Sequence, residues 1–391
     1  MGKIKLCALT TRSMTMRSFW YDTLVFFSQN NIDVTIICEP DDFYNNLNNT
    51  NIHYIPIKIK SGLDSPLNII KKINKLKKIF KKNKFDIVQY ASTNMGFYSS
   101  IAAKKVNIPV RIFGQWGLRY TGSRGIGRII YKNIEKIICS NSTHVQGDSP
   151  SIENFAICDG VLKKEKCDII WNGSSTGVDL AKFSPQYCVV NNNIFRKELN
   201  INSNCIVFGF IGRINRDKGI IELLKAFDRL NSKTQKDIKL IIVGPMEDDS
   251  YIKNQMKDFL TKNKNIIAVG MQYNVLKYYS MFDFLVLPSY REGIATVLLE
   301  GCSCGLPIIS TNILGSTDVV IENFNGFLCS PGLVDSLFET MFRALNISEG
   351  DYNRLSKNSR QLMEEKFDHE KLAKKLLDDR ISKYNLFCKS K

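Results

Sequence analysis

The feature that most constrains the fold of this chain is a rhythm in which short apolar runs alternate with longer amphipathic stretches. A short apolar run bounded by turn residues is typical of a buried strand, and a longer amphipathic stretch is typical of a helix. Strands that alternate with helices form a parallel sheet covered on both faces. Because the rhythm occurs twice, we expect an α/β protein with two doubly wound, Rossmann-like domains that face each other across a cleft.

The first half of the chain contains the less regular of the two patterns. Its expected strands are Ile4–Leu9, Val34–Cys38, His53–Ile57, Asp86–Tyr90 and Val110–Phe113, and the segments Thr143–Gly147 and Cys167–Trp171 close this half. Its expected helices are Arg17–Ser28, Leu67–Lys82, Tyr98–Lys105 and Arg128–Cys139.

The second half repeats the pattern more cleanly. Its expected strands are Ile206–Ile211, Lys239–Val243, Ile266–Val269, Phe284–Leu287 and Pro307–Ser310. Its expected helices are Gly219–Leu230, Ser250–Leu260, Ala295–Cys304, Val334–Leu345, Asp351–Lys366 and His369–Tyr384.

Between the two halves the rhythm breaks, and the residues there favour turns. We therefore place an N-terminal domain at 1–171, a linker at 172–190 and a C-terminal domain at 191–368. The last segment, 369–391, is expected to be a helix that could pack back on the N-terminal domain. A length of 391 residues allows two domains of ordinary size.

Composition excludes several classes of protein. Hydrophobic residues make up 44% and charged residues 24%, as in an ordinary globular protein. No apolar run is long enough to span a membrane, and Arg12 and Arg17 interrupt any signal-peptide core. The cysteines are scattered without zinc-type spacing. We expect a cytoplasmic protein that contains no disulfide scaffold and no structural zinc.

The charge is unevenly distributed. The net charge is +16, and residues 51–150 alone hold 18 Lys and Arg against 4 Asp and Glu. Within this region, Leu67–Lys82 has an apolar stripe at helical spacing (Ile69, Ile70, Ile73, Leu76, Ile79 and Phe80) with lysines elsewhere. A one-sided positive field favours an anionic partner such as phosphate, nucleic acid or an acidic membrane. The alternative is a basic surface that only keeps the protein in solution.

Two common nucleotide-binding motifs are missing. A dinucleotide-binding domain would carry a glycine fingerprint after its first strand, but Leu9–Met14 contains no glycine. No P-loop motif is present. These absences argue against a nicotinamide-dependent dehydrogenase and against a P-loop kinase or ATPase.

The loop after strand Ile206–Ile211 has the composition of an anion site. Gly212 allows a tight turn, Arg213 and Lys218 lie on either side of a short loop, and Lys218 opens the next helix. Helix N-termini favour anions, and two cations strengthen such a site. The loop could hold a diphosphate, or it could be a surface loop with two solvated cations.

A pair of glutamates follows strand Phe284–Leu287. Glu292 lies in the loop after the strand, and Glu300 lies in the apolar helix that follows. Carboxylates in such a setting need partners, and sugar hydroxyls are suitable ones. A structural cation is the alternative partner for Glu300.

Taken together, these motifs resemble the family 4 retaining glycosyltransferases of GT-B fold. The resemblance lies in Gly212-Arg213 with Lys218-Gly219, and in Glu292 and Glu300 with seven residues between them. It is strong over about residues 205–345 and loose over the N-terminal half. Supporting pieces are Val243-Gly244-Pro245, Val269-Gly270, Asp283–Ser289 and Gly305–Ile309.

The resemblance implies a role for each matching residue. Arg213 and Lys218 would bind the diphosphate of a nucleotide-sugar, Glu292 would contact the transferred sugar, and these three would carry catalysis. Glu300 would hold the ribose. The remaining donor-binding positions would be Gly212, Gly270, Met271, Gln272, Gly293, Ile294 and Ala295. The resemblance also implies that no metal or other cofactor is used, and the chain offers no Asp-x-Asp metal motif at a strand end.

The N-terminal half departs from the family pattern. Many relatives have a histidine near the end of a strand in this domain, whereas this chain has Trp116 at the corresponding place. Trp116 could stack on a sugar or belong to the core. On the acceptor side we expect Thr11, Trp116 and Arg119.

The resulting prediction is a hexosyltransferase that makes surface polysaccharide such as lipopolysaccharide O-antigen. Its donor would be a nucleotide-sugar, preferably a UDP-sugar, and its acceptor a polyprenyl-diphosphate-linked or other saccharide. It would lie peripherally on the anionic inner face of the cytoplasmic membrane and bind no nucleic acid. Two alternatives remain: a nucleotide-sugar epimerase of GT-B fold, and a nucleic-acid-binding protein that uses its basic half.

Overall fold

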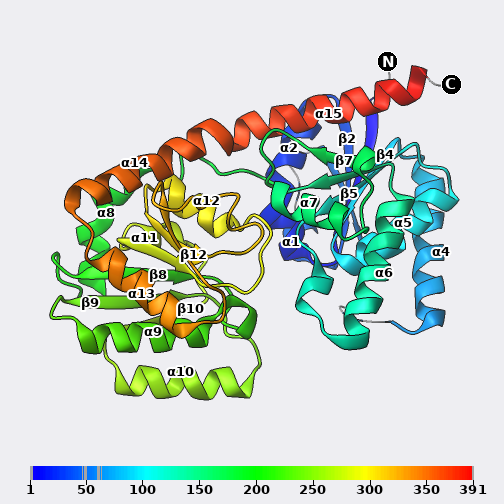
Figure 1. Cartoon of the computed structure of the whole chain (residues 1–391). Coiled ribbons are helices and arrows are strands. Elements are labelled where there is room, and N and C mark those ends of the chain that lie inside the picture. Colours follow the sequence, from blue (N-terminus) through cyan, green and yellow to red (C-terminus); the bar gives the residue numbers. More distant parts are fainter. Residues whose placement is uncertain (1–2, 46, 48–50, 60–61, 63, 390–391) are drawn as a thin grey trace. The chain divides into compact units, whose positions relative to one another are not determined.

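A computed structural model describes residues 3–45, 47, 51–59, 62 and 64–389 of the chain. The chain forms two compact units (Figure 1). Unit 1 comprises Met1–Thr176 and Glu370–Lys391, and unit 2 comprises Gly177–His369. Residues 172–176, within the predicted linker, thus belong to unit 1, and residues 185–190 form the beginning of a helix in unit 2.

Unit 1 is built on a parallel seven-stranded sheet with the order β3-β2-β1-β4-β5-β6-β7. Its strands are β1 (Ile4–Leu9), β2 (Ile32–Cys38), β3 (Ile52–Pro56), β4 (Ile87–Ala91), β5 (Val110–Gln115), β6 (His144–Gly147) and β7 (Cys167–Ile169). The chain winds outward in both directions from β1 and β4, as in a doubly wound fold.

Helices cover both faces of this sheet and bury two separate apolar clusters. On one face, α4, α5 and α6 lie side by side (Figure 1). On the other face, the apolar cluster includes Leu24 of α2 and Leu372 and Leu376 of α15. The helices of unit 1 are α1 (Ser13–Phe19), α2 (Tyr21–Gln29), α3 (Asp42–Asn45), α4 (Pro66–Asn83), α5 (Thr93–Lys105), η1 (Arg119–Gly122), α6 (Gly125–Asn141), α7 (Pro150–Cys158), η2 (Lys164–Lys166) and α15 (His369–Lys389).

Unit 2 contains a parallel six-stranded sheet with the order β10-β9-β8-β11-β12-β13 and one large apolar core. Its strands are β8 (Ile206–Ile211), β9 (Ile238–Val243), β10 (Ile266–Gly270), β11 (Phe284–Leu287), β12 (Ile308–Thr311) and β13 (Gly326–Cys329). Its helices are α8 (Pro185–Glu198), η3 (Arg216–Lys218), α9 (Ile220–Lys233), α10 (Ser250–Lys262), α11 (Leu276–Tyr279), α12 (Thr296–Ser303), α13 (Val334–Leu345) and α14 (Glu349–Lys366). The predicted fold class, two doubly wound α/β domains, is confirmed.

Two local predictions in unit 1 were wrong. The expected helix Arg17–Ser28 is two helices, α1 and α2, which are separated at Trp20. Ile70 was assigned to the apolar stripe that packs on the sheet, but it is 56% exposed. The buried stripe of α4 is narrower and consists of Ile73, Leu76 and Phe80.

Candidate functional site

The loop after β8 forms a compact turn whose geometry is set by its own polar groups. The amide of Gly212 donates a hydrogen bond to the carbonyl of Val243 at 2.9 Å. The side-chain oxygen of Asn215 accepts a hydrogen bond from the amide of Lys218 at 3.1 Å and so caps η3. The turn ends at Gly219, whose φ of +66° is a conformation that favours glycine.

Gly219 also brings this loop against the end of β11. A Cβ atom at position 219 would lie 2.1 Å from the carbonyl oxygen of Pro288, so no larger residue fits without moving the backbone. Nearby, the amide of Tyr290 donates to the carbonyl of Asp217 at 2.8 Å. Because β8 and β11 are neighbours in the sheet, their two loops form one surface at the carboxyl ends of the strands.

Lys218 and Glu292 meet on this surface. The Lys218 Nζ atom lies 2.5 Å from Glu292 Oε1, and the two side chains are only 17% and 11% exposed. A charge pair that water reaches poorly is less screened than a pair on the open surface. The structure thus brings together a predicted diphosphate ligand and a predicted sugar ligand that lie 74 positions apart in the sequence.

Arg213 lies in a more open environment. Its side chain is 61% exposed and pairs with the half-exposed Glu247, which follows β9. Glu247 is a partner that the sequence did not indicate. Exposed ion pairs contribute little to stability, so a ligand that replaced Glu247 would disturb the fold little.

The amides of Gly293–Ala295 lead into α12. Ile294 is buried, so only its backbone can face a ligand. A Cβ atom at Gly315 would lie 2.3 Å from the carbonyl oxygen of Gly293, and this close approach fixes the loop from the β12 side. Helix α12 begins directly afterwards at Thr296, so the N-terminal dipole of α12 points toward this loop.

Glu300 projects from α12 and is held by a tyrosine. Tyr279 donates a hydrogen bond from its hydroxyl to Glu300 Oε2 at 2.6 Å. Burial of the carboxyl group raises the pKa of Glu300 to about 7, while the Tyr279 hydrogen bond and the charge of Lys182 act in the opposite direction. The sequence had singled out Glu300 but not Tyr279.

The predicted base-binding segment follows β10. Gly270 has a φ of +70°, and its carbonyl accepts a hydrogen bond from the amide of Gly244 at 2.8 Å. Gln272 donates from its side-chain amide to the carbonyl of Val269 at 2.9 Å, whereas Met271 is 46% exposed. The segment therefore presents an apolar side chain beside a backbone turn at the same strand edge as the other donor-side residues.

The three predicted acceptor residues lie in unit 1. Trp116 packs against Phe19 and Trp20, with ring centroids 5.0 and 4.7 Å apart. The Arg119 guanidinium lies over the ring of Tyr131 at 4.2 Å. Thr11 is buried, and its hydroxyl has no hydrogen-bond partner among the described residues. Trp116 and Arg119 thus have packing roles of their own, and acceptor binding by all three stays a prediction.

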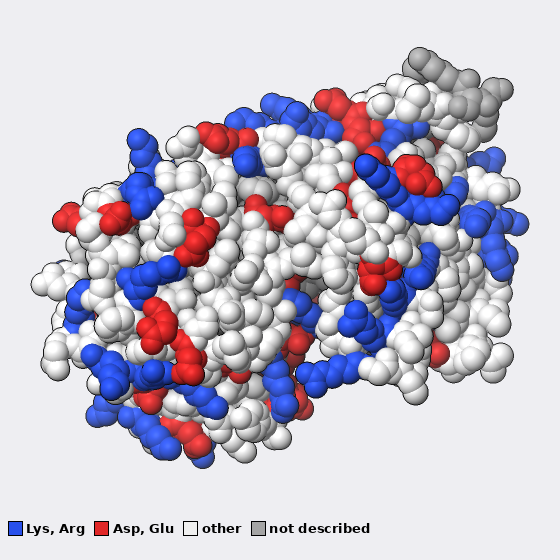
Figure 2. All heavy atoms as spheres, in the orientation of Figure 1, with Lys and Arg blue, Asp and Glu red and all other residues white. Residues whose placement is uncertain are grey.

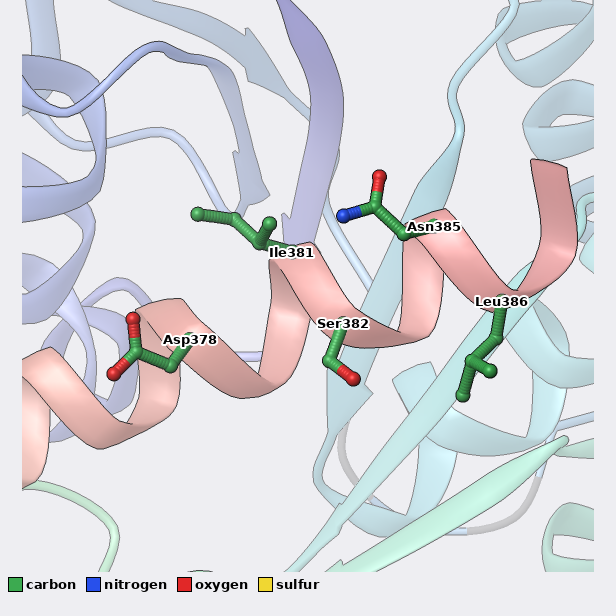
Figure 3. A pocket seen from close by; sticks show the side chains of 5 residues that line it. All are labelled: Asp378, Ile381, Ser382, Asn385 and Leu386. Carbon is green, nitrogen blue, oxygen red and sulfur yellow. The ribbon is translucent and has the colours of Figure 1, made fainter. Parts of the chain in front are cut away.

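Two hollows in the structure lie away from these residues. One of about 360 Å³ is lined by residues from a single helix, α15: Asp378, Ile381, Ser382, Asn385 and Leu386 (Figure 3). Another of about 280 Å³ lies near the starts of β1, β2 and β3. Neither is lined by a predicted site residue.

Two kinds of feature are absent from the part of the chain that the structure describes. No group of three or more His, Cys, Asp or Glu side chains is arranged to hold a metal ion in that part of the chain. No helix among the described residues combines the length and apolar character needed to cross a membrane.

Two protein-family models match this chain, and together they cover nearly all strands of the two sheets. A model described as glycosyl transferases group 1 matches residues 191–362, and one described as glycosyl transferase 4-like matches residues 5–149. This chain belongs to the group 1 glycosyltransferases. The resemblance inferred from the glycine, lysine and glutamate motifs is therefore confirmed.

Curated relatives of this glycosyltransferase match over most of their length. The capsular polysaccharide biosynthesis glycosyltransferase CapM of Staphylococcus aureus is 29% identical over 364 residues, which cover 93% of this chain and 92% of CapM. The UDP-Gal:alpha-D-GlcNAc-diphosphoundecaprenol alpha-1,3-galactosyltransferase of Escherichia coli is 27% identical, over 79% of this chain and 78% of that enzyme.

Solved structures confirm that this glycosyltransferase has the GT-B fold. A glycosyltransferase from Rickettsia africae aligns over 100% of both chains with a TM-score of 0.78 and 18% identity. The lipopolysaccharide outer core galactosyltransferase WaaB aligns over 97% of this chain and 100% of its own, with a TM-score of 0.70 and 18% identity.

Proposed function

We propose that this glycosyltransferase moves a hexose or N-acetylhexosamine from a nucleotide-sugar, preferably a UDP-sugar, to a lipid-linked saccharide during surface polysaccharide synthesis. The observation that carries the proposal is the Lys218–Glu292 pair, which lies at the carboxyl ends of the strands of unit 2. Lys218, a cation suited to a leaving diphosphate, is there in direct contact with Glu292, whose carboxylate can accept hydrogen bonds from sugar hydroxyls. The similarity to a capsular polysaccharide biosynthesis glycosyltransferase supports the proposed role in surface polysaccharide synthesis.

In the proposed reaction, Arg213 and Lys218 neutralise the charge that develops on the departing nucleoside diphosphate. Stabilisation of developing charge by fixed cations is a large catalytic effect, and it requires no metal. The bond from the anomeric carbon to the donor phosphate breaks as the acceptor hydroxyl attacks from the same face. A donor phosphate oxygen takes the acceptor proton, and the configuration is retained. Glu292 holds the transferred sugar, and Glu300 holds the ribose.

The names of two relatives support a polyprenyl-linked acceptor. The E. coli relative is named for a UDP-Gal donor and a diphosphoundecaprenol-linked acceptor. A Campylobacter jejuni relative, 23% identical over 84% of this chain and 86% of its own, is named an N,N'-diacetylbacillosaminyl-diphospho-undecaprenol alpha-1,3-N-acetylgalactosaminyltransferase. We propose an acceptor of the same chemical class here.

The function is tested with purified protein, a panel of UDP- and GDP-sugars, and a short polyprenyl-diphosphate-linked N-acetylglucosamine as acceptor, all in excess EDTA. We expect nucleotide release that depends on the acceptor, and a lengthened saccharide with the donor's anomeric configuration. Turnover abolished by EDTA and restored by Mg²⁺ or Mn²⁺ would contradict the metal-free mechanism. Conversion of a nucleotide-sugar to its epimer without an acceptor would replace the proposal with epimerase activity.

The charge on unit 1 supports contact with an anionic membrane. In Figure 2, Lys and Arg side chains gather over the region of α4 and α6 with few Asp or Glu among them, whereas both signs are interspersed on unit 2. The first turns of these helices also expose aliphatic side chains, namely Leu67 and Ile70 on α4 and Ile126 and Ile129 on α6. Exposed apolar residues among basic ones are typical of surfaces that bind anionic lipid.

Sedimentation with liposomes tests this membrane contact. We expect the protein to bind vesicles that contain phosphatidylglycerol but not vesicles of phosphatidylcholine alone, and about 0.5 M salt to weaken the binding because it shortens the Debye length. Replacing Lys75, Lys78 and Lys82 with Gln should weaken binding by up to about a hundredfold, since each lysine near an anionic surface contributes about 1 kcal/mol and about 1.4 kcal/mol corresponds to a factor of ten.

The matched control replaces three lysines of α10 in unit 2, Lys253, Lys257 and Lys262, with Gln. This variant has the same net charge as the α4 variant and should bind vesicles like the wild type. Equal binding to neutral and anionic vesicles, or equal loss in both variants, would contradict a specific basic surface on α4. Activity on a water-soluble acceptor should be unchanged in both variants.

A further inference from the structure

We propose that Tyr279 is a positioning residue for the nucleotide, because its hydroxyl aims the Glu300 carboxylate at the ribose. The proposal rests on the ribose-binding role of Glu300 in the proposed function. It adds a residue that neither the sequence motifs nor the names of the relatives indicate.

Tyr279 is held rigidly at the end of α11. It is completely buried, and its ring packs edge-on against Phe183 and Phe282, with centroids 5.8 and 6.2 Å away. Side chains packed in this way have little freedom to rotate. The direction of the Tyr279 hydroxyl is therefore fixed by the core of unit 2.

Among the described residues, the hydrogen bonds of the hydroxyl both go to α12. It lies 2.6 Å from Glu300 Oε2 and 3.3 Å from the carbonyl oxygen of Val297, one turn earlier in the same helix. Burial raises the pKa of Tyr279 well above its ordinary value, so the phenol stays protonated and acts as the donor. The contact thus fixes one carboxylate oxygen of Glu300 against a rigid ring.

The other carboxylate oxygen, Oε1, is not hydrogen-bonded to any residue that the structure describes. Glu300 is partly exposed, and Oε1 is not one of the buried polar atoms that lack a partner among the described residues, so it can be reached from outside. A carboxylate oxygen accepts more than one hydrogen bond, and a ribose offers two neighbouring hydroxyl donors. With Oε2 held by Tyr279, the geometry leaves Oε1 to accept from the ribose.

The same contact affects the charge of Glu300. Burial raises the pKa of Glu300 to about 7, and the hydrogen bond from Tyr279 lowers it, as does the charge of Lys182. The pKa of the neighbouring Cys304 thiol is raised by its hydrogen bond with Cys188 and by burial, and the charge of Glu300 adds to that shift. Without the Tyr279 hydroxyl, the pKa of Glu300 rises further, and less of the carboxylate is present at neutral pH.

The experiment measures binding of UDP and of 2′,3′-dideoxy-UDP by calorimetry in the wild type and in Tyr279→Phe. Phenylalanine keeps the packed ring and removes only the hydroxyl. We expect UDP to bind about tenfold more weakly, because a hydrogen bond that orients a charged group is lost. Dideoxy-UDP, which lacks both hydroxyls, should lose less than about twofold, since it cannot report on Glu300.

The pH profile provides a second measure that a structural role alone would not change. UDP affinity of the wild type should fall as the pH drops through about 7, where Glu300 becomes protonated. In Tyr279→Phe the midpoint of that fall should move to higher pH. In a Glu300→Gln background, Tyr279→Phe should change UDP affinity little, since the two residues act as one unit.

The matched control is Tyr352→Phe. Tyr352 also lies in unit 2, and its hydroxyl donates to a backbone carbonyl, that of Asp283, at 3.2 Å. Removing the Tyr352 hydroxyl should lower the melting temperature about as much as removing the Tyr279 hydroxyl does. The UDP affinity of Tyr352→Phe should equal that of the wild type.

Three results would overturn the inference. If Tyr279→Phe binds UDP like the wild type, or loses affinity equally for UDP and dideoxy-UDP, Tyr279 does not act on the ribose. Either result leaves the proposed function intact, because the wild type still binds the nucleotide. If the wild type binds neither UDP nor GDP, the proposed function fails, and the role of Tyr279 fails with it.

Discussion

Replacing Lys218 with methionine is expected to lower kcat by about ten- to a hundredfold. Methionine keeps most of the side-chain volume and removes the charge that would stabilise the departing diphosphate. A hydrogen bond to a charged group contributes about 1.5–3 kcal/mol, which corresponds to that range of rates. The loss should appear in single-turnover assays of nucleotide release with saturating donor. Arg213→Met should give a loss in the same range.

A control for Lys218→Met is Lys253→Met. Lys253 pairs with Asp248 at 2.7 Å on the open surface of unit 2, so it tests the loss of a lysine in an ion pair without a bound phosphate. This control should retain wild-type turnover and melting temperature. If Lys218→Met and Arg213→Met both remained within twofold of the wild type, the two cations could not be the diphosphate ligands.

Glu292→Gln is expected to lower kcat by about a hundredfold while UDP binds at least as tightly as in the wild type. The amide keeps the shape of the side chain but is a weaker acceptor for sugar hydroxyls, and a contact that strengthens in the transition state affects kcat most. The change also frees Lys218 from its ion pair with Glu292, which leaves its full charge for the diphosphate. Steady-state kinetics and UDP calorimetry measure the two effects separately.

The comparison variant is Glu300→Gln. If Glu300 holds the ribose, this change should weaken UDP itself and affect kcat at saturating donor less than Glu292→Gln does. The two glutamates lie in one segment, so a general disturbance of the loop would affect both variants alike. Equal weakening of UDP binding by both changes would show that the assigned roles are wrong.

Much of the fold could be predicted because its buried strands are short, continuous apolar runs. Ile206–Ile211 and Phe284–Leu287 were predicted with the bounds that the structure has. The elements that were missed carry weaker signals. Strand β13 has four residues, one of which is glycine, so its apolar run is shorter than that of β11. Helix α7 has nine residues, although Ser149-Pro150 at its start is a helix-capping pair that could have been recognised.

Sequence motifs predict some residues of the candidate site but not the partners that hold them in place. Lys218 and Glu292 could be placed at the same sheet edge because each follows a strand, and the neighbouring order of β8 and β11 brings them into contact. Glu247 and Tyr279 could not be found in this way. Their partners, Arg213 and Glu300, lie 34 and 21 positions away, and no motif links the residues of either pair.

Exposure was the property least accessible from the sequence. Helical spacing assigned Ile70 to the buried stripe of α4, but periodicity cannot show how far the sheet extends beneath a helix. For Trp116 the sequence left sugar stacking and core packing open. Its contacts with Phe19 and Trp20 depend on the loop path after β5, which one sequence does not reveal.

Helix α15 has a consequence for how the chain acquires its structure during synthesis. Leu372 and Leu376 complete the apolar core of unit 1, yet they follow the whole of unit 2 in the chain. Unit 2 is one continuous stretch, and its ends are joined by hydrogen bonds from Val178 to Phe367 and from His369 to Val178. Domains usually mature in order from the N-terminus as they leave the ribosome. Here we expect the reverse. Unit 2 can complete its folding first, while unit 1 keeps an apolar face of its sheet uncovered until α15 has been synthesised.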